Sequence, residues 1–320
     1  MRILALVPGG ISDQLLFFPA LDDIKRAYPN AEIGVVVEPK AAPAYRVSKI
    51  VDTVVPFSYS AAKTPSDWAN LLGIVRDREY EVVLSADTTW STGLMLWLSG
   101  IPTRVAYKTT KAPYFYTATV SSAAKYQAER YHDLLSGIEM GTATPALAIN
   151  VPEADIKWAD ALRDRLELKD GYVLMYPGPT TAYGDQQASY PLASWQALIK
   201  DFKEKQPDMA IVLLQTDDSS EQVNLLKSQD AQLLITTAQN LGQAAALIAG
   251  ANLMIAPDSH IMQLAVALKV FTLVLFGKNQ PEEMLPATEG EETRFLGLTA
   301  DSRKIADIKP EAVLQKVWGG

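Results

Sequence analysis

Residues 256–277 read APDSHIMQLAVALKVFTLVLFG, and this stretch decides the fold of the chain. It continues an apolar run at residues 252–256 and ends in a second apolar run at residues 271–276. Between the runs lie a polar turn (Pro-Asp-Ser, residues 257–259) and a segment whose apolar residues recur at helical spacing. The pattern predicts a strand, a turn, a helix and a strand, which is the βαβ unit of a parallel sheet. In open α/β sheets such a turn is where ligands bind, and the helix end that follows it favours anions such as phosphate.

The same alternation extends over both halves of the chain and predicts an α/β fold with parallel, doubly wound sheets. Strands are expected at residues 3–7, 32–38, 51–57, 80–85, 104–108, 172–176, 210–215 and 232–236. Helices are expected at residues 15–27 (interrupted near its start by Pro19), 66–77, 91–98, 127–138, 155–166, 192–204, 220–227, 241–249 and 311–318. Residues 108–131 break the rhythm and predict a long loop leading into a helix, and residues 141–152 are the best linker candidate. We therefore expect two Rossmann-like domains, residues 1–150 and 151–320, with an active site in the cleft between them.

Composition is typical of a soluble globular protein and removes several functional classes. The chain has 320 residues, of which 48% are hydrophobic and 21% charged, and its net charge of −8 argues against general binding to nucleic acid. The absence of cysteine excludes thiol catalysis, disulfides and thiolate metal sites. The apolar run at residues 3–7 is too short for a signal peptide, and no stretch approaches the roughly 18–20 apolar residues of a membrane span. We expect a cytoplasmic protein with at most peripheral contact at the inner face of a membrane.

An ordered set of short motifs covers nearly the whole chain. The motifs lie at residues 1–4, at Asp13 and Pro19 with a spacing of six, and at residues 104–107, 176–178, 190–195, 240–251, 258–268 and 276–286. In this order they resemble glycosyltransferase family 9, which contains the ADP-heptose:lipopolysaccharide heptosyltransferases. The resemblance implies a GT-B fold with two facing Rossmann-like domains, in which residues 1–150 bind the acceptor and residues 151–320 the nucleotide-sugar. It also implies inverting transfer without a metal or other cofactor, from a nucleotide-sugar (an ADP-sugar first) to an anionic glycolipid acceptor of the lipopolysaccharide core.

Asp13 lies in the polar turn after the first predicted strand, and two interpretations of it stay open. Ser12 or Asp13 can simply cap the following helix, since Ser and Asp lead among helix caps. The resemblance implies instead that Asp13 is the general base that deprotonates the acceptor hydroxyl. A carboxylate suits that role if a water-poor site raises its pKa. The family usually has Gly immediately before this Asp, where the present chain has Ser12.

The resemblance assigns the donor to polar residues of the second half: Thr180, Thr181, Glu221, Asp258, Ser259, His260 and Gln263. Ser259 and the helix amino end behind it would hold the donor phosphates, and Asp258 would orient the loop or touch sugar hydroxyls. The alternative is that Asp258 and Ser259 only cap this helix. Glu221 resembles the family's acidic residue near the ribose, although the helix dipole by itself favours an acid in a first turn.

Three positions of the expected phosphate site depart from the family pattern. His260 replaces a Gly, and its side chain would crowd a pyrophosphate that approaches the backbone. Gln263 replaces a His. Ala188 stands where the family has a Lys, and loss of that cation removes a charge-assisted contact of roughly 1.5–3 kcal/mol. Thr180 and Thr181 can still donate hydroxyl groups.

Residues 104–130 combine five basic residues with one acid and five aromatic rings, which is unusual in a chain of net charge −8. One interpretation is an irregular surface loop with its rings folded inward. The other is a patch for an acceptor or a membrane surface, in which Arg104, Lys108 and Lys111 bind phosphate or carboxylate groups.

Three functions remain open on the sequence alone. The first is an inverting glycosyltransferase with Asp13 as general base. The second is a family member that has lost transfer activity and serves as a binding or scaffolding protein, which the replaced residues His260, Gln263 and Ala188 favour. The third is an epimerase of the two-domain sugar-nucleotide type, which the lack of a second acid/base group paired with Asp13 disfavours.

Overall fold

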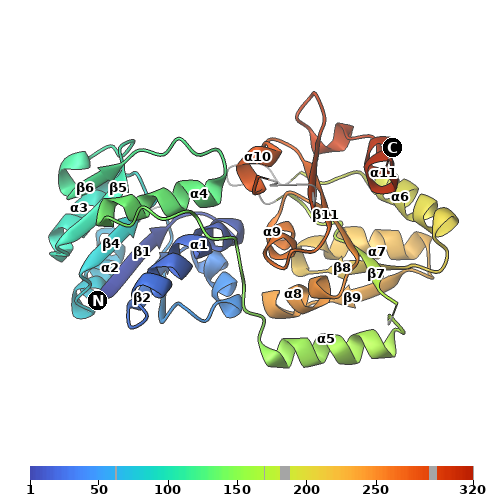
Figure 1. Cartoon of the computed structure of the whole chain (residues 1–320), viewed down its shortest axis with the longest axis horizontal. Coiled ribbons are helices and arrows are strands. Elements are labelled where there is room, and N and C mark those ends of the chain that lie inside the picture. Colours follow the sequence, from blue (N-terminus) through green and yellow to red (C-terminus); the bar gives the residue numbers. More distant parts are fainter. Residues whose placement is uncertain (62, 169, 181–187, 288–293, 320) are drawn as a thin grey trace. The chain divides into compact units, whose positions relative to one another are not determined.

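The computed structural model describes residues 1–61, 63–168, 170–180, 188–287 and 294–319, and the chain divides into two compact units (Figure 1). The first unit is Met1–Ala148 and the second is Ile149–Gly320. Each unit is built around one six-stranded sheet whose neighbouring strands are all parallel. Within the described part of the chain, no helix is both long enough and apolar enough to cross a bilayer.

The first unit has the strand order β3-β2-β1-β4-β5-β6. Helix α1 packs against α4, and α2 packs against α3, so that helices cover both faces of this sheet (Figure 1). In chain order its elements are β1 (Arg2–Val7), α1 (Ile11–Ala27), β2 (Glu32–Val37), η1 (Pro39–Val47), β3 (Thr53–Pro56), α2 (Pro65–Asp77), β4 (Val82–Ser85), α3 (Trp90–Ser99), β5 (Thr103–Tyr107), η2 (Pro113–Phe115), β6 (Ala118–Val120), α4 (Gln127–His132) and η3 (Asp133–Ile138).

The second unit repeats this topology with the strand order β12-β11-β10-β7-β8-β9. Helices α5, α8 and α9 pack together, and α6 packs against α7 and α11. Its elements are α5 (Glu153–Arg165), β7 (Tyr172–Met175), α6 (Leu192–Lys205), β8 (Ala210–Gln215), η4 (Asp217–Ser219), α7 (Ser220–Gln229), β9 (Leu234–Thr237), α8 (Leu241–Ala249), β10 (Leu253–Pro257), α9 (His260–Ala267), β11 (Thr272–Phe276), α10 (Pro281–Met284), β12 (Phe295–Thr299), η5 (Ile305–Asp307) and α11 (Pro310–Trp318).

The central strands are apolar along their length because helices bury them on two faces. Every residue of β10 and β11 is buried, as are residues 3–7 of β1. Large side chains of the flanking helices complete the cores. In the second unit, Trp195 of α6 is fully buried and meets Tyr190 edge to face, with 5.4 Å between the ring centroids. Such a ring pair adds to the free energy of burial because the edge of one ring faces the π-cloud of the other.

The predicted α/β fold with two parallel sheets is confirmed, and most predicted elements agree with the structure within a few residues. Two details were wrong. Helix α1 runs from residue 11 to residue 27 without a break at Pro19, because packing of the buried residues around Pro19 outweighs its missing N–H. Residues 108–131 are not all loop, since β6 pairs with β5. A three-residue edge strand is too short to leave a periodic signal.

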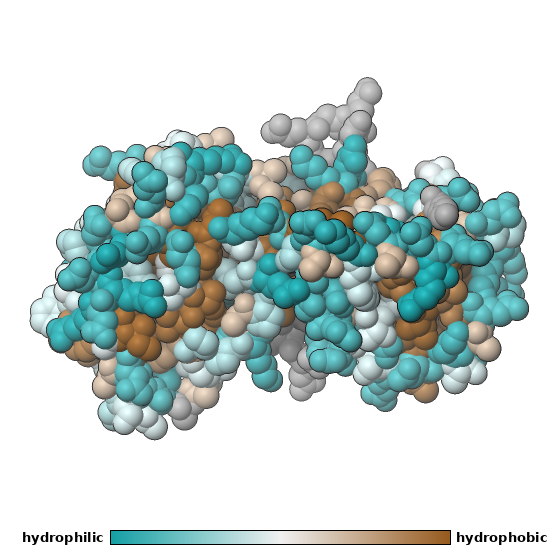
Figure 2. Space-filling view, turned by 90° about the horizontal axis from the view of Figure 1, so that it is seen from below, coloured by the Kyte–Doolittle hydropathy of each residue, from teal (hydrophilic) through white to brown (hydrophobic). Residues whose placement is uncertain are grey.

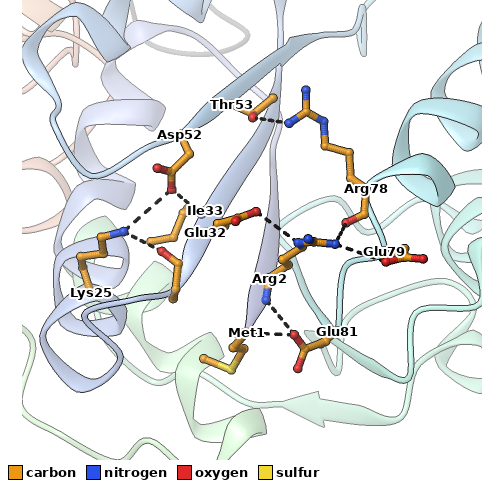
Figure 3. Close-up of polar contacts among 11 residues, drawn as sticks. Met1, Arg2, Lys25, Glu32, Ile33, Asp52, Thr53, Arg78, Glu79 and Glu81 are labelled. Carbon is orange, nitrogen blue, oxygen red and sulfur yellow. Dashed lines mark hydrogen bonds and ion pairs between the residues drawn. The ribbon is translucent and has the colours of Figure 1, made fainter.

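Charged residues form ion pairs at the amino edge of the first sheet, where the strands begin (Figure 3). Arg2 at the start of β1 pairs with Glu32 at 3.1 Å and with Glu79 at 3.3 Å. The Arg2 backbone N–H also donates a hydrogen bond to Glu81 at 3.0 Å. These pairs are exposed, so each adds at most about 1 kcal/mol to the free energy of unfolding. Their charges are therefore paired within the protein.

We predict that Trp195→Ala lowers the free energy of unfolding by about 3–5 kcal/mol, because the indole is fully buried and leaves a cavity. The matched control is Trp97→Ala, whose side chain is 53% exposed, with an expected change within about 1 kcal/mol. Urea unfolding followed by circular dichroism measures both. Equal losses in the two variants would contradict the assignment of Trp195 to the core.

Candidate functional site

The strand order of each sheet reverses between two central neighbours, β1 and β4 in the first unit and β7 and β10 in the second. Open α/β sheets bind ligands at the carboxyl ends of such a pair. Asp13 and Asp87 follow β1 and β4, while Thr180 and Asp258 follow β7 and β10. Each unit therefore carries polar residues at its own switch point, where its fold favours a ligand.

Asp13 lies in the first turn of α1, is partly exposed, and accepts hydrogen bonds on both carboxylate oxygens. The Gly10 N–H donates to Oδ2 at 2.8 Å, and the Tyr131 hydroxyl donates to Oδ1 at 2.9 Å. Burial raises the pKa of Asp13, and these hydrogen bonds, which favour the ionised form, reduce that effect. Gly10 is the N-cap of α1, so the expected cap at Ser12 or Asp13 is wrong: both residues lie inside the helix, and Asp13 accepts a hydrogen bond from the N-cap N–H instead. The same carboxylate is also partly desolvated, which is the condition that suits a general base.

Gly9 makes room for this carboxylate. Its φ of +112° lies in the region that L side chains rarely adopt, and an ideal Cβ would lie 2.3 Å from Asp13 Oδ2. A side chain at position 9 would therefore strain the backbone and displace Asp13. The turn between β1 and α1 is thus shaped around the Asp13 side chain.

Asp87 is a second, buried carboxylate at the carboxyl edge of the first sheet, and no motif in the sequence marks it. The Thr89 N–H donates to Oδ1 at 2.9 Å, and the Thr89 hydroxyl donates to Oδ2 at 3.0 Å. The Thr92 hydroxyl also donates to Oδ2, and the Ser85 hydroxyl donates to the Asp87 carbonyl at 3.0 Å. These contacts indicate that Asp87 fixes the connection from β4 to α3.

The three basic residues assigned to the acceptor differ in their surroundings. The Arg104 guanidinium donates to the carbonyls of Phe115, at 2.7 Å, and Ile101, and burial lowers the pKa of Arg104. Through these contacts the Arg104 side chain stabilises the local main chain. Lys108 and Lys111 are exposed and follow the carboxyl end of β5. The Lys111 N–H donates to the carbonyl of Thr88 at 3.0 Å, which ties this loop to the segment after β4.

Asp258 and Ser259 form a buried turn between β10 and α9. The Ser259 hydroxyl accepts a hydrogen bond from the Met262 N–H at 3.4 Å, so the capping interpretation of Ser259 is confirmed. The side-chain amide of Asn279 donates to Asp258 Oδ2 at 2.8 Å, and the Asp258 N–H donates to the carbonyl of Leu275 at 3.0 Å. Asp258 is therefore held by the segment after β11, as a residue that orients the loop would be.

His260 is the first residue of α9 and is only 7% exposed. Burial lowers the pKa of His260 to about 4, against a smaller opposing effect of Asp218, so the imidazole is neutral at pH 7. Gln263, one turn later, is fully buried, and its Nε2 donates to the carbonyl of Met284 at 2.9 Å. Its Oε1 has no hydrogen-bond partner among the residues that the structure describes. Neither His260 nor Gln263 brings a positive charge to this helix end.

The remaining residues assigned to the donor are spread over the second unit. Thr180 is buried, its N–H donates to the carbonyl of Ala188 at 2.8 Å, and its Oγ1 accepts from the Ala188 N–H at 3.2 Å. Thr181 lies outside the described residues. Glu221 is exposed in the first turn of α7, where the helix dipole favours an acid. In the described parts of the chain, no group of three or more His, Asp or Glu side chains is arranged to hold a metal ion.

Sequence reasoning missed Tyr131 and Asn279, which position the two carboxylates. Tyr131 lies 118 residues from Asp13, and Asn279 lies 21 residues from Asp258. Neither residue carries a local signal of this role, since a Tyr in a short helix and an Asn after a strand are both common. Only the packing of α4 on α1, with the Phe17 and Tyr131 rings 5.2 Å apart, brings the hydroxyl to Asp13.

Comparison with known proteins identifies relatives over most of the chain. Residues 68–308 match the family model of glycosyltransferase family 9 (heptosyltransferase). The fold is similar to that of a family 9 glycosyl transferase from Veillonella parvula, with a TM-score of 0.82 and 17% identity over 99% of this chain and 96% of that one. It is similar to E. coli ADP-heptose lps heptosyltransferase II, with a TM-score of 0.77 and 18% identity over 99% and 97% of the two chains. Among curated proteins, the chain is 22% identical to the photosynthetic NDH subunit of subcomplex B 1, chloroplastic, of Arabidopsis thaliana, over 96% of this chain and 71% of that protein.

We predict that acidification destabilises the protein through His260. Its pKa is about 4 in the folded state and 6.5 in the unfolded chain, so the stability from its neutral form is fully present above pH 6.5. This stability is lost as the pH falls from 6.5 toward about 4, by about 3 kcal/mol in all. Urea unfolding across this range should show a steeper loss for the wild type than for His260→Gln. Parallel profiles would contradict the burial of the imidazole.

We predict that Asp13→Asn does not destabilise the protein at pH 7. Because the folded-state pKa of Asp13 is raised above 3.8, its contribution to stability is present below pH 3.8 and is lost as the pH rises through the folded-state pKa. The variant should therefore gain stability relative to the wild type between acidic and neutral pH. Urea midpoints at both pH values measure this gain. A loss of about 0.5–2 kcal/mol at pH 7 would instead indicate that Asp13 is chiefly a helix cap.

Proposed function

The chain belongs to glycosyltransferase family 9, and we propose that it is an inverting, metal-independent glycosyltransferase of the heptosyltransferase kind. In this proposal it transfers a heptose-like sugar from a nucleotide-sugar, an ADP-sugar first, to a lipopolysaccharide-type core acceptor. The donor class is supported by the similarity to a heptosyltransferase whose name specifies ADP-heptose.

The observation that carries the proposal is the environment of Asp13. A carboxylate with a raised pKa follows the first strand at the switch point of its sheet, held by the Gly10 N–H and the Tyr131 hydroxyl. In the reaction, Asp13 takes the proton of the acceptor hydroxyl as that oxygen attacks the anomeric carbon. The nucleoside diphosphate leaves from the opposite side, so the anomeric centre is inverted. The two hydrogen bonds would fix the orientation of the carboxylate, which is what proton transfer at a defined angle requires.

The donor side of the proposal uses the carboxyl edge of the second sheet. The amino end of α9 and the Ser259 hydroxyl would bind the diphosphate, since a helix amino end carries partial positive charge and unpaired N–H groups. The hydroxyl groups of Thr180 and Thr181 would complement this contact, and Glu221 would approach the ribose, whereas the His260 side chain would restrict access to the helix end. Asp258, held by Asn279, would keep the turn in place for the sugar.

The acceptor side of the proposal uses the basic residues of the first unit. Lys108 and Lys111 are exposed at the carboxyl edge and could pair with phosphate or carboxylate groups of an anionic glycolipid. Arg104 would contribute mainly by holding the loop that carries Phe115, because its guanidinium already donates to main-chain carbonyls.

A second candidate function is a binding or scaffolding protein without transfer activity. It is favoured by the neutral, buried His260 at the amino end of α9, where the family pattern has a Gly. The similarity to a plant protein named as a subunit of an assembly also favours it. In this alternative, Asp13 keeps its hydrogen bonds and stabilises the first turn of α1 without a catalytic role.

Calorimetric titration with ADP, ADP-heptose and UDP-sugars distinguishes the two functions. We predict saturable binding of one nucleotide-sugar, and tighter binding by His260→Gly, because removing the imidazole opens the helix end to a diphosphate. A folded protein that binds none of these ligands, in both the wild type and His260→Gly, would favour the scaffold.

For the general base, Asp13→Asn should leave donor affinity unchanged and lower the rate of nucleotide release with acceptor present by about 10²–10⁴-fold. The matched control is Asp77→Asn, which changes an exposed acid of the same unit and should retain full turnover. Undiminished turnover in Asp13→Asn would refute the role of Asp13 as base.

A further inference from the structure

Helix α3 of the first unit is apolar on the side that faces solvent as well as on the side that faces the core. It contains no charged residue, and its buried side consists of Thr92, Gly93, Met95 and Leu96. Trp90 is 58% exposed and Trp97 is 53% exposed. A surface helix normally carries polar residues on its outer face, so an apolar outer face indicates a surface that is covered in use.

The rings of α3 continue into the neighbouring 3₁₀ helix η2 and form one aromatic patch. Trp97 lies 6.1 Å from Phe115 between ring centroids, and Phe115 lies 4.5 Å from Tyr114, whose side chain is 75% exposed. Trp90 lies seven residues before Trp97, two helical turns away on the same side of α3. We refer to Trp90, Trp97, Tyr114 and Phe115 as the aromatic patch.

The segment that carries the aromatic patch is positively charged, although the whole chain has a net charge of −8. Residues 82–128 contain four basic residues (Arg104, Lys108, Lys111 and Lys125) and a single acid, Asp87. With the buried Asp87 counted, four basic residues and one acid leave this segment a net charge of +3. Lys111 is bonded through its backbone to Thr88, two residues before Trp90, which brings a cation to the edge of the patch.

We propose that the aromatic patch and its lysines form a docking surface for a membrane that carries anionic headgroups. Trp and Tyr rings partition to the boundary between headgroups and acyl chains, where the apolar ring and the polar N–H or O–H are both satisfied. Lys108 and Lys111 add attraction to the negative surface potential of such a membrane. Binding to a lipid surface requires no pocket, which agrees with aromatic side chains exposed on the outer face of a helix. The proposal concerns binding only and does not depend on the proposed transfer reaction.

Co-sedimentation of the full chain with vesicles tests the proposal. We expect binding to vesicles of equal parts phosphatidylglycerol and phosphatidylcholine, and little binding to phosphatidylcholine alone. The double change Trp97→Ala with Tyr114→Ala should weaken partitioning by about tenfold, because two interfacial rings are lost. The double change Lys108→Gln with Lys111→Gln should weaken it by at least about tenfold, and only with anionic vesicles.

The matched control is the double change Leu225→Ala with Phe271→Ala, which removes apolar side chains of the second unit that are 45% and 38% exposed. Hydrophobic residues are exposed on the visible face of both units (Figure 2), and this control tests whether exposed apolar side chains outside the aromatic patch contribute to binding. Circular dichroism checks the fold of each variant, and Trp90→Ala tests the other end of the patch if a double variant fails to fold. The proposal is overturned if the wild type does not bind anionic vesicles, if both vesicle types bind equally, or if the Trp97/Tyr114 variant binds as the control does. A surface that instead serves a protein partner would give the first of these results.

Discussion

The structure depends on burying parallel strands on both faces. A strand covered by helices on two sides carries mainly apolar side chains, so most of the polar chemistry of each unit lies at the ends of its strands. In the first unit, exposed ion pairs around Arg2 occupy the amino edge, and the carboxyl edge holds Asp13, Asp87 and the lysines after β5. In the second unit, the carboxyl edge holds Thr180 and the turn at Asp258. The positions of the candidate residues follow from this constraint before any particular reaction is considered.

Asp13 shows how one side chain can be suited both to the fold and to the proposed reaction. From the first turn of α1 its carboxylate accepts a hydrogen bond from the N–H of the N-cap residue Gly10, and it is desolvated enough that its pKa is raised. The two effects oppose each other, since the hydrogen bonds favour the charge and burial disfavours it. Gly9 is needed for both, because any Cβ at that position would meet the carboxylate. The hydrogen bond from Tyr131 of α4 holds the carboxylate in this position.

The altered residues are concentrated in the second unit, and their effect is electrostatic as well as steric. A helix amino end attracts a diphosphate through N–H groups and a partial positive charge, and a nearby cation strengthens that attraction. Here His260 is neutral at pH 7, Gln263 is turned to the carbonyl of Met284, and Ala188 supplies no charge. A diphosphate bound at this helix end would therefore be held by backbone N–H groups and by hydroxyl groups such as that of Ser259. The two proposed functions, transfer and scaffolding, therefore differ in what they require of this helix end.

The sequence by itself determined the alternation of strands and helices, the parallel sheets, the family resemblance and the polar turns at residues 13 and 258. These features are local, because periodicity, turn residues and spacing are written in neighbouring positions of the chain. Only the tertiary structure decided what those turns do. In the folded chain the Tyr131 hydroxyl donates to Asp13, 118 residues away, and the Asn279 amide donates to Asp258. The Arg104 guanidinium donates to main-chain carbonyls, and burial makes His260 neutral. Each of these outcomes depends on burial and on partners distant in sequence, and a pKa or a hydrogen bond is set by the atoms around a group rather than by its neighbours along the chain.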